Sequence, residues 1–494
     1  MVRAWMTVAA LAMAVPSAGC TETREAAAFA IAGDPATELE RYREAGVLNG
    51  AVLIGKGDKI LYAAGHGLGG VDGEPLTADH RFRIASVSKQ FTVAAALKLA
   101  EQGKLSLDDV ITDHLPYYEP AAGNRITIAQ LMAHDSGIDR RAGRRADVRV
   151  LKVEDPEPHI RRIMSDPLRG EPGAAARGEG QSHYSNANYW ILGAIIEEAS
   201  GLSYKEAVRT LLLDPLGLDE TSLPEADEPI AMEARGMAPT VLGWEAADYM
   251  DDHGAPYAAG MIVSTVGDLF RWTRALHGGE VFEDPAMLTV MTEPAEPWVD
   301  SDWYGKVATG RGLFRAERAN GRTFIYHDGH IGPYYSDLRY FPQSDITTVV
   351  LINGDEMDGS MAVTHVSDAL ESLAHGEPVA PPEASLWRRA AMALRTGADD
   401  EATQLAGEMD EGSINWMAYQ FLGRGRPDEA IALLERGIEA HPQSANMRDS
   451  YGEALWHAGR DADAIAAYRS ALALDPNLEN ASAMIARIEA GERP

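Results

Sequence analysis

Ser86-Val87-Ser88-Lys89 stands directly before a segment rich in alanine and leucine, Phe91 to Gln102, and this stretch decides the fold. Apolar residues recur there at helical spacing and Gly103 supplies a C-terminal stop, so the sequence predicts a helix with Ser86 at its N-terminus. Lys89 then lies on the same face one turn later. The positive end of the helix dipole favours negative charge on the Ser86 oxygen, and a desolvated lysine is a base that can activate it. Alternatively, Ser86 only caps the helix and Lys89 is solvated.

Two further polar residues, Tyr184 and Asn186, precede an apolar segment, Asn188 to Ser200, which we expect to form a helix that ends at Gly201. Two positions apart in an extended segment, their side chains can point the same way. A phenol beside a lysine can act as a general base or acid, and an amide can orient a substrate. The alternative is a buried tyrosine followed by an asparagine N-cap.

A third polar group, His327-Asp328-Gly329, follows a stretch with β-strand character at 322–326, and further strand candidates lie at 338–341 and 346–352. Gly329 would let a substrate backbone lie close to the strand, because it has no side chain. His327 offers a hydrogen-bond donor whose charge depends on pH.

In this order, the three groups resemble the signature motifs of the serine β-lactamase and penicillin-binding-protein superfamily, in its class C-like and family VIII carboxylesterase-like branch. Neighbouring segments also resemble that branch: L-M-A-H-D-S-G-I at 131–138, Y-S-N-A-N-Y-W-I-L-G at 184–193 and A-A-G-M-I-V-S-T-V-G-D-L at 258–269. The resemblance spans residues 38–375. It implies an α/β (α+β) fold in which an antiparallel sheet is flanked by helices and accompanied by a helical domain.

The resemblance also implies a role for each site residue. Ser86 would be the acylated nucleophile, Lys89 and Tyr184 would share proton transfer, and Asn186 would assist positioning. His327 would belong to the catalytic strand motif, and Asp328 and Gly329 would contact the substrate. The backbone N–H groups of Ser86 and His330 would form the oxyanion hole, whose donors are typically worth about 10²–10³ in kcat.

The third motif departs from the pattern of β-lactam-hydrolysing members, which usually carry K-T-G where this chain has H-D-G. A neutral histidine suits a substrate carboxylate less well than a lysine does. We also find no E-x-x-L-N segment. We therefore expect hydrolysis of an ester or amide of a small molecule or peptide. Two alternatives stay open: a D-Ala-directed peptidase or β-lactamase acting on cell-wall peptides or β-lactams, and a non-catalytic ligand-binding protein whose C-terminal repeats recruit a partner.

Rival motifs carry less weight. The glycine pattern G-x-G-x-x-G at 65–70 is followed by V-D-G-E-P, where a dinucleotide site needs a helix, so we expect a hairpin turn. His327-x-x-His330 is a weak metal pattern, and H-E-x-x-H is absent from the sequence, so we expect neither a metal nor a cofactor. His134-Asp135-Ser136 contains the residue types of a serine-protease triad, but consecutive residues cannot form a proton relay, so this segment indicates a structural turn.

The N-terminal residues predict export. Arg3 precedes an apolar run from Trp5 to Val15, which is too short to span a bilayer but suits a signal peptide over residues 1–20. Cys20 is the single cysteine and resembles the lipidation site of a bacterial lipoprotein, although Ser17 stands where leucine is usual. We expect a periplasmic or cell-envelope lipoprotein, with secretion as the alternative, and a linker at 21–37. The formal net charge of −31 argues against binding to nucleic acid or to the surface of an anionic membrane. We expect contact with a membrane only through the lipid anchor.

The C-terminal part reads as a separate module. A Pro-rich linker at 376–384 precedes an all-helical region at 385–494, in which residue pairs repeat at an offset of 34, for example Gly425-Arg426 and Gly459-Arg460. This period resembles tetratricopeptide repeats, whose stacked helices form a concave surface for peptides or partner proteins. The alternative is that the module packs on the hydrolase domain or caps itself.

Overall fold

The computed structural model describes residues 33–70, 72–118, 120–142, 156–179, 184–224, 228–241, 243–247, 257–354, 361–382, 384–396 and 398–494. The predicted signal peptide and Cys20 lie outside these residues. The first helix, α1 (Pro35–Glu44), begins within the last residues of the segment predicted as a linker at 21–37. Asp34 caps this helix by accepting from the Ala36 N–H, and Pro35 suits its first turn. In the described part of the chain, no helix combines the length and the apolar character needed to cross a bilayer.

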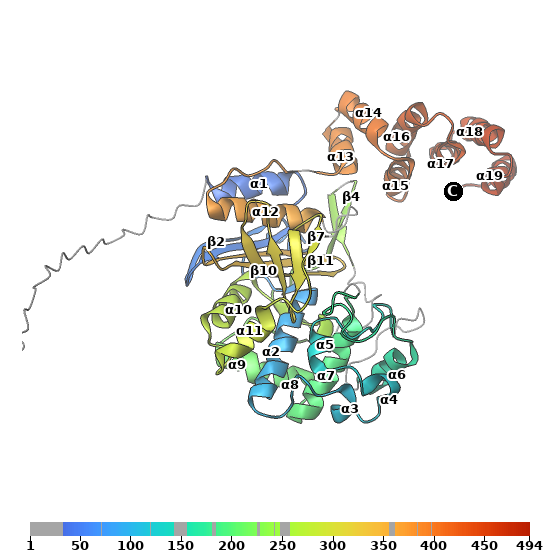
Figure 1. Ribbon diagram of the computed structural model, residues 1–494. Helices are drawn as coiled ribbons and strands as arrows, with labels where there is room; N and C mark the ends of the chain where they lie inside the picture. Colours follow the sequence, from blue (N-terminus) through green and yellow to red (C-terminus); the bar gives the residue numbers. More distant parts are fainter. Residues whose placement is uncertain are drawn as a thin grey trace, which may run out of the picture.

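An eight-stranded antiparallel sheet forms the centre, in the order β2-β1-β12-β11-β10-β9-β8-β7 (Figure 1). The first strand pairs with the last, with Gly50 opposite Ile352, so the sheet brings distant parts of the chain together. β12 is buried along its whole length because both faces of the sheet are covered. The strands are β1 (Gly50–Lys56), β2 (Lys59–His66), β7 (Val299–Ser301), β8 (Gly305–Thr309), β9 (Phe314–Glu317), β10 (Thr323–Ile331), β11 (Tyr334–Phe341) and β12 (Ile346–Ile352).

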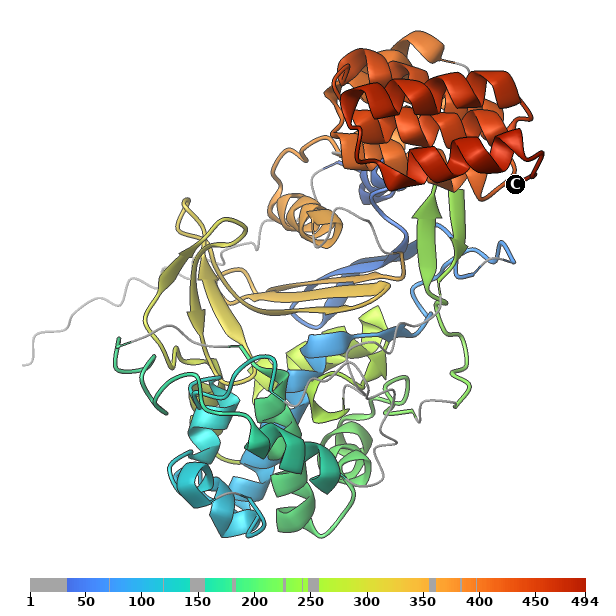
Figure 2. The same ribbon diagram turned by 90° about the vertical axis from the view of Figure 1, so that its right-hand side faces the viewer.

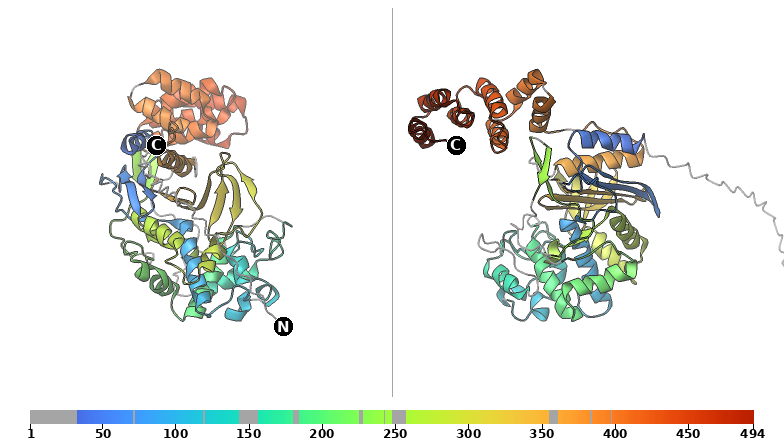
Figure 3. Two further views of the ribbon diagram at one scale, coloured as in Figure 1. Left: turned by 60° about the vertical axis from the view of Figure 1, so that its left-hand side comes forward. Right: turned by 180° about the vertical axis from the view of Figure 1, so that it is seen from behind.

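Alternate residues of the central strands supply two apolar layers. Val52 and Val350 pack with α1 and α12 (Met361–His375) on one face. Leu53 and Leu351 belong to the apolar cluster of the opposite face, where α10 (Val266–Gly278) packs against β1 and β12. The helices of this side, which include α11 (Pro285–Thr292), lie across the sheet from α1 and α12 (Figure 3). This period of two is what a sheet with both faces covered requires.

A helical domain lies beneath the second face, around α2 (Ser88–Glu101) (Figure 2). Residues 88–97 of α2 are all buried, so this helix runs through the centre of the domain. α7 (Asn186–Ser200) packs against it and ends at Gly201, which adopts the left-handed φ of +72° that glycine tolerates. Smaller elements complete the domain: α3 (Ile111–His114), α4 (Pro120–Gly123), α5 (Ile128–Met132), α6 (Glu157–Ser165), α8 (Tyr204–Val208), the π-helical turn η2 (Arg209–Leu213), α9 (Asp214–Leu216) and the strand pair β3 (Phe82–Arg83) and β6 (Val263–Ser264).

The C-terminal module is all-helical, as predicted. Helices α15, α17 and α19 begin at residues 411, 445 and 479, each 34 residues after the previous one, which matches the predicted repeat. The helices are α13 (Leu386–Thr396), α14 (Asp399–Glu408), α15 (Glu411–Leu422), α16 (Pro427–Ala440), α17 (Ala445–His457), α18 (Asp461–Leu474) and α19 (Glu479–Glu489).

A hairpin of β4 (Met237–Thr240) and β5 (Gly243–Ala246) joins this module to the rest of the molecule (Figure 2). Its tip residue Val241 is fully buried in the apolar cluster of the module. The Arg388 guanidinium lies 4.8 Å from the centre of the Trp244 ring, and Arg424 pairs with Glu245 at 2.5 Å. One end of the C-terminal module therefore packs on the N-terminal domain, which agrees with the alternative that the module packs on the hydrolase domain.

Candidate active site

Ser86 and Lys89 meet at the start of α2. Ser86 lies in a 3₁₀ turn, η1 (Ala85–Val87), directly before the helix, and the Lys89 Nζ donates a hydrogen bond to the Ser86 Oγ at 2.9 Å. A second bond, of 2.7 Å, joins the Lys89 Nζ to the carbonyl oxygen of Ala259. The predicted placement of Ser86 at a helix N-terminus beside Lys89 is confirmed. The carbonyl of Ala259 fixes the direction of the amine, and this contact was not predicted.

Lys89 is completely buried, which overturns the alternative of a solvated lysine. Burial lowers the pKa of Lys89 well below its usual value, and the carboxyl group of Asp328 only partly opposes this shift. Aromatic rings surround the amine: its Nζ lies 5.0 Å from the centre of the Tyr184 ring and 5.3 Å from that of Tyr189. A lysine with a lowered pKa holds a larger neutral fraction at a given pH than an exposed lysine does, and the neutral amine is the form that acts as a base.

Tyr184 borders the same space with 37% of its surface exposed. Although part of the side chain is exposed, desolvation of its hydroxyl group raises the pKa of Tyr184 above its usual value, and a hydrogen bond with Ser86 opposes the shift. The phenol is therefore held in its protonated form. His134 supports it from behind: the two ring centres are 4.3 Å apart, and the His134 Nδ1 accepts a hydrogen bond from the Ser185 N–H at 3.1 Å. The 134–136 segment thus acts as the structural turn that the sequence predicts.

Asn186 is the first residue of α7 and lines the cavity. The N-cap position belongs to Ser185, so the alternative of an asparagine N-cap is wrong, and the helix begins two residues earlier than predicted. The buried Asn186 Oδ1 has no hydrogen-bond partner among the described residues. A buried acceptor without a partner is costly, so this atom is suited to a donor on a ligand.

His327 and Gly329 lie inside β10, not after a strand, because pairing with β11 continues as far as Ile331. Gly329 lies against the Ser86 turn so closely that a Cβ atom there would be 2.9 Å from the Ser86 nitrogen. The His327 Nδ1 lies 2.5 Å from the backbone oxygen of Asp328, and burial lowers the pKa of His327 to about 3. His327 is therefore neutral at ordinary pH.

Asp328 was predicted to contact the substrate, but its carboxyl group does not lie on the side of the strand that faces Ser86. Asp328 pairs in register with Asp337 across the two strands, and alternation along β10 places it on the face of Asp337 and Arg339, opposite to His327 and Gly329. Burial, with the charge of Asp337, raises the pKa of Asp328 to about 6. Its backbone, not its carboxyl group, is thus the part that lies toward Ser86.

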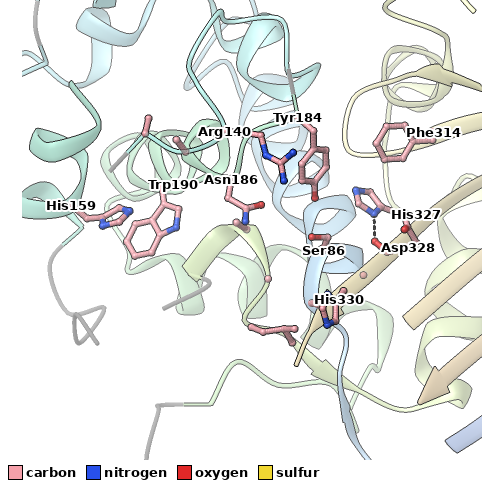
Figure 4. A pocket seen from close by; sticks show the side chains of 17 residues that line it. Ser86, Arg140, His159, Tyr184, Asn186, Trp190, Phe314, His327, Asp328 and His330 are labelled. Atoms are coloured by element: carbon pink, nitrogen blue, oxygen red, sulfur yellow. Dashed lines mark hydrogen bonds between the residues drawn. The ribbon is translucent and has the colours of Figure 1, made fainter. Parts of the chain in front are cut away.

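Ser86, Tyr184, Asn186 and residues 327–330 line a cavity of about 490 Å³ (Figure 4). Four further side chains of its wall were not singled out from the sequence: Arg140, His159, Trp190 and Phe314. The ring centres of His159 and Trp190 lie 3.9 Å apart, and those of Phe314 and His327 lie 5.0 Å apart. Arg140 stands two residues after the 131–138 segment, which was the signal that could have revealed it.

The weak metal pattern His327-x-x-His330 does not converge. His327 is buried, whereas His330 is exposed and its ring stacks on Tyr335 with 4.1 Å between centres. Within the described ranges, no group of three histidine, cysteine, aspartate or glutamate residues is placed to hold a metal ion.

Comparisons with known proteins agree with this architecture. The β-lactamase family model matches residues 35–371, and a tetratricopeptide-repeat model matches residues 417–479. Protein flp of Staphylococcus aureus is 33% identical over 337 residues, which cover 64% of this chain and 62% of flp. Penicillin-binding protein 4* of Bacillus subtilis is 27% identical over 372 residues, or 70% of this chain and 77% of that protein.

A solved structure, the octameric penicillin-binding protein homologue from Pyrococcus abyssi, has a TM-score of 0.58 and 25% sequence identity over 73% of this chain and 80% of that chain. The family match includes the sheet, the helical domain and the residues around the cavity. Proteins with this fold are generally serine hydrolases. The resemblance predicted from the three motifs is confirmed: the chain belongs to the β-lactamase family and carries C-terminal tetratricopeptide repeats.

Proposed function

We propose that the protein is an exported serine hydrolase that cleaves an ester or amide through an acyl-enzyme on Ser86. The observation that carries this proposal is the 2.9 Å hydrogen bond between the Ser86 Oγ and a completely buried Lys89 amine. A serine is a poor nucleophile until a base takes its proton, and a desolvated lysine is such a base.

In the first step, the neutral Lys89 amine takes the Ser86 proton as the Oγ bonds to the substrate carbonyl carbon. The carbonyl electrons move to the oxygen, and the N–H groups of Ser86 and His330 are our candidates for its oxyanion hole. The raised pKa of Tyr184 keeps its phenol protonated, so Tyr184 can give its proton to the leaving group as the carbon–heteroatom bond breaks. Lys89 then returns its proton to the phenolate, and water hydrolyses the acyl-enzyme by the reverse route.

The pKa shifts of Lys89 and Tyr184 favour Lys89 as the first base, because desolvation destabilises both an ammonium on Lys89 and a phenolate on Tyr184. The lysine therefore starts the cycle neutral and the tyrosine starts it protonated. Each group begins in the state that its step requires.

A β-lactamase or D-Ala-directed peptidase is the second candidate, and the match to penicillin-binding protein 4* favours it. Against it stands His327, because burial keeps its imidazole neutral where β-lactam-hydrolysing members usually have a lysine. We therefore place ester or amide hydrolysis first.

Export rests on the N-terminal apolar run and on Cys20, which we propose as a lipidation site. The C-terminal repeats are proposed to bind a protein partner through the helices that lie beyond the docked hairpin. Both are separate from the chemistry at Ser86.

The test is intact-mass labelling of the full chain with a serine-reactive phosphonate and with a penicillin, in the wild type and in Ser86→Ala. We expect the phosphonate to add one adduct to the wild type and none to the variant, with little modification by penicillin. Efficient labelling by penicillin would favour the second candidate. If no ester, amide or β-lactam probe modifies Ser86, the catalytic proposal fails and the non-catalytic binding protein takes its place.

A further inference from the structure

We propose that Arg140 binds a carboxylate of the substrate, so that this hydrolase acts on acidic esters or amides. The inference rests on the proposed function, since it names the substrate class of the same cavity. It concerns a side chain that has no counterpart in the three motifs.

Arg140 is exposed and lines the cavity, and Figure 4 shows its guanidinium beside the Tyr184 ring and directed into that space. Its side chain forms no ion pair and no hydrogen bond with any described residue. Nearby arginines differ in this respect: Arg125 pairs with Glu171 at 2.9 Å, and Arg169 lies 3.5 Å from Asp139. Because a guanidinium is always protonated in proteins, the cavity wall carries a permanent positive charge whose donors are not taken up by any described side chain.

No other arginine or lysine is among the described residues that line the cavity. The Lys89 amine is hydrogen-bonded to Ser86 and to Ala259, and its pKa is lowered. Burial lowers the pKa of His159 to about 4 and that of His327 to about 3, so both rings are neutral near pH 7. Arg140 is thus the permanent cation among the described residues of the wall.

Asp328 does not neutralise this charge, because its carboxyl group belongs to the opposite face of the sheet, with Asp337 and Arg339. The planar fork of an arginine matches a carboxylate with two parallel hydrogen bonds. Beside it, the unpartnered Asn186 Oδ1 offers an acceptor for a substrate N–H or O–H, and Trp190 offers an apolar surface. A substrate that carries a carboxylate as well as an ester or amide bond fits this combination.

The direct test uses matched pairs of esters. The first pair is the p-nitrophenyl half-ester of glutaric acid and its methyl ester, which place the charge on the acyl side. The second pair is the butyrate ester of 4-hydroxybenzoate and the same ester of methyl 4-hydroxybenzoate, which place it on the leaving group. The enzymes are the wild type, Arg140→Gln, Arg140→Lys and the control Arg169→Gln, whose side chain lies outside the cavity wall.

We expect the wild type to prefer the acidic member of at least one pair. Arg140→Gln should lower kcat/KM for that ester by about 10- to 100-fold, the range for a lost hydrogen bond to a charged group, and should change the neutral ester by less than about twofold. Arg140→Lys should retain part of the preference, and raising salt to about 0.5 M should weaken it. Equal losses on both members of a pair, or no preference in the wild type, would overturn the inference.

A binding experiment keeps this inference separate from the proposed function. Titration calorimetry with the half-amide of glutaric acid compares Ser86→Ala with the double variant that also carries Arg140→Gln, and neither needs turnover. We expect binding that the second substitution weakens about 10-fold or more. Equal or absent binding in both variants refutes the role of Arg140 even if Ser86 is labelled, whereas a failure of labelling alone refutes only the hydrolase.

Discussion

Replacement of Gly329 by alanine should disable Ser86 without any change to a catalytic side chain. An added Cβ would lie 2.6 Å from the backbone oxygen of Ile84, 2.9 Å from the Ser86 nitrogen and 2.5 Å from the Ser336 Oγ. Ordinary non-bonded contacts are about 3.5 Å or more, so the strand and the Ser86 turn must separate by roughly 0.5–1 Å. Two of the three contacts are backbone atoms, which cannot rotate away.

A displacement of about 1 Å at a reacting group can cost about 10²-fold in rate, and overpacking costs about 1–3 kcal/mol of stability. We therefore expect the second-order rate constant for phosphonate labelling of Ser86 to fall about 100-fold in Gly329→Ala, with a measurable loss in Tm. Intact-mass spectrometry over time gives the rate, and calorimetry gives the Tm.

Two further variants test the reasoning. Gly267→Ala is the matched control, because the nearest atom to its Cβ is the Thr265 Oγ1 at 3.7 Å, and it should label at the wild-type rate. Adding Ser336→Ala to Gly329→Ala removes the side-chain contact only, so it should not restore labelling. A Gly329→Ala protein that labels within about threefold of the wild type, with unchanged Tm, would refute the proposed contact between strand and turn.

Three other predictions concern titratable groups. The labelling rate of Ser86 should rise with pH through the lowered pKa of Lys89, and Lys89→Met should lose about 10²-fold or more; a flat pH profile in the wild type would contradict this. Tyr184→Phe should slow esters with poor leaving groups by about 10²-fold but leave p-nitrophenyl esters nearly unchanged, and equal losses would exclude a role as general acid. The pKa of Asp328 is raised from 3.8 to about 6 in the folded state, so between these two pH values the folded protein binds a proton that the unfolded chain has lost. This group therefore lowers the stability of the fold as pH rises from 3.8 to about 6. At about pH 8, Asp328→Asn should therefore raise the Tm, and the gain in the free energy of unfolding should be no more than about 3 kcal/mol. At about pH 4 the substitution should change the Tm little. The same gain at both pH values would refute the raised pKa of Asp328.

Much of the site could be predicted from the sequence because its signals are local. The pair Ser86 and Lys89 depends on helical spacing, and the helix that follows has an apolar pattern that predicts burial. The repeat of the C-terminal module also shows directly in the order of residues. In each case, the interactions that create the feature join residues within a few turns of one another.

The remaining features depend on tertiary contacts. The carbonyl of Ala259 that binds Lys89 lies 170 residues away along the chain, and no local pattern indicates it. The burial of His327 and Asp328 sets their pKa values in opposite directions, although the two are neighbours in sequence. Arg140 has no partner among the described residues because of which side chains lie around it in the fold, and the sequence does not show this.

The docked hairpin has a consequence for how the protein unfolds. Val241 is a residue of the N-terminal part of the chain, yet its side chain is buried in the apolar cluster of the C-terminal helices. Removing those helices would expose this valine and the Trp244 ring at the end of a two-stranded ribbon, which alone is marginally stable in water. The sequence divides into two modules near the Pro-rich segment, but the cooperative unit crosses that division, and the hairpin should melt together with the first helices of the repeats.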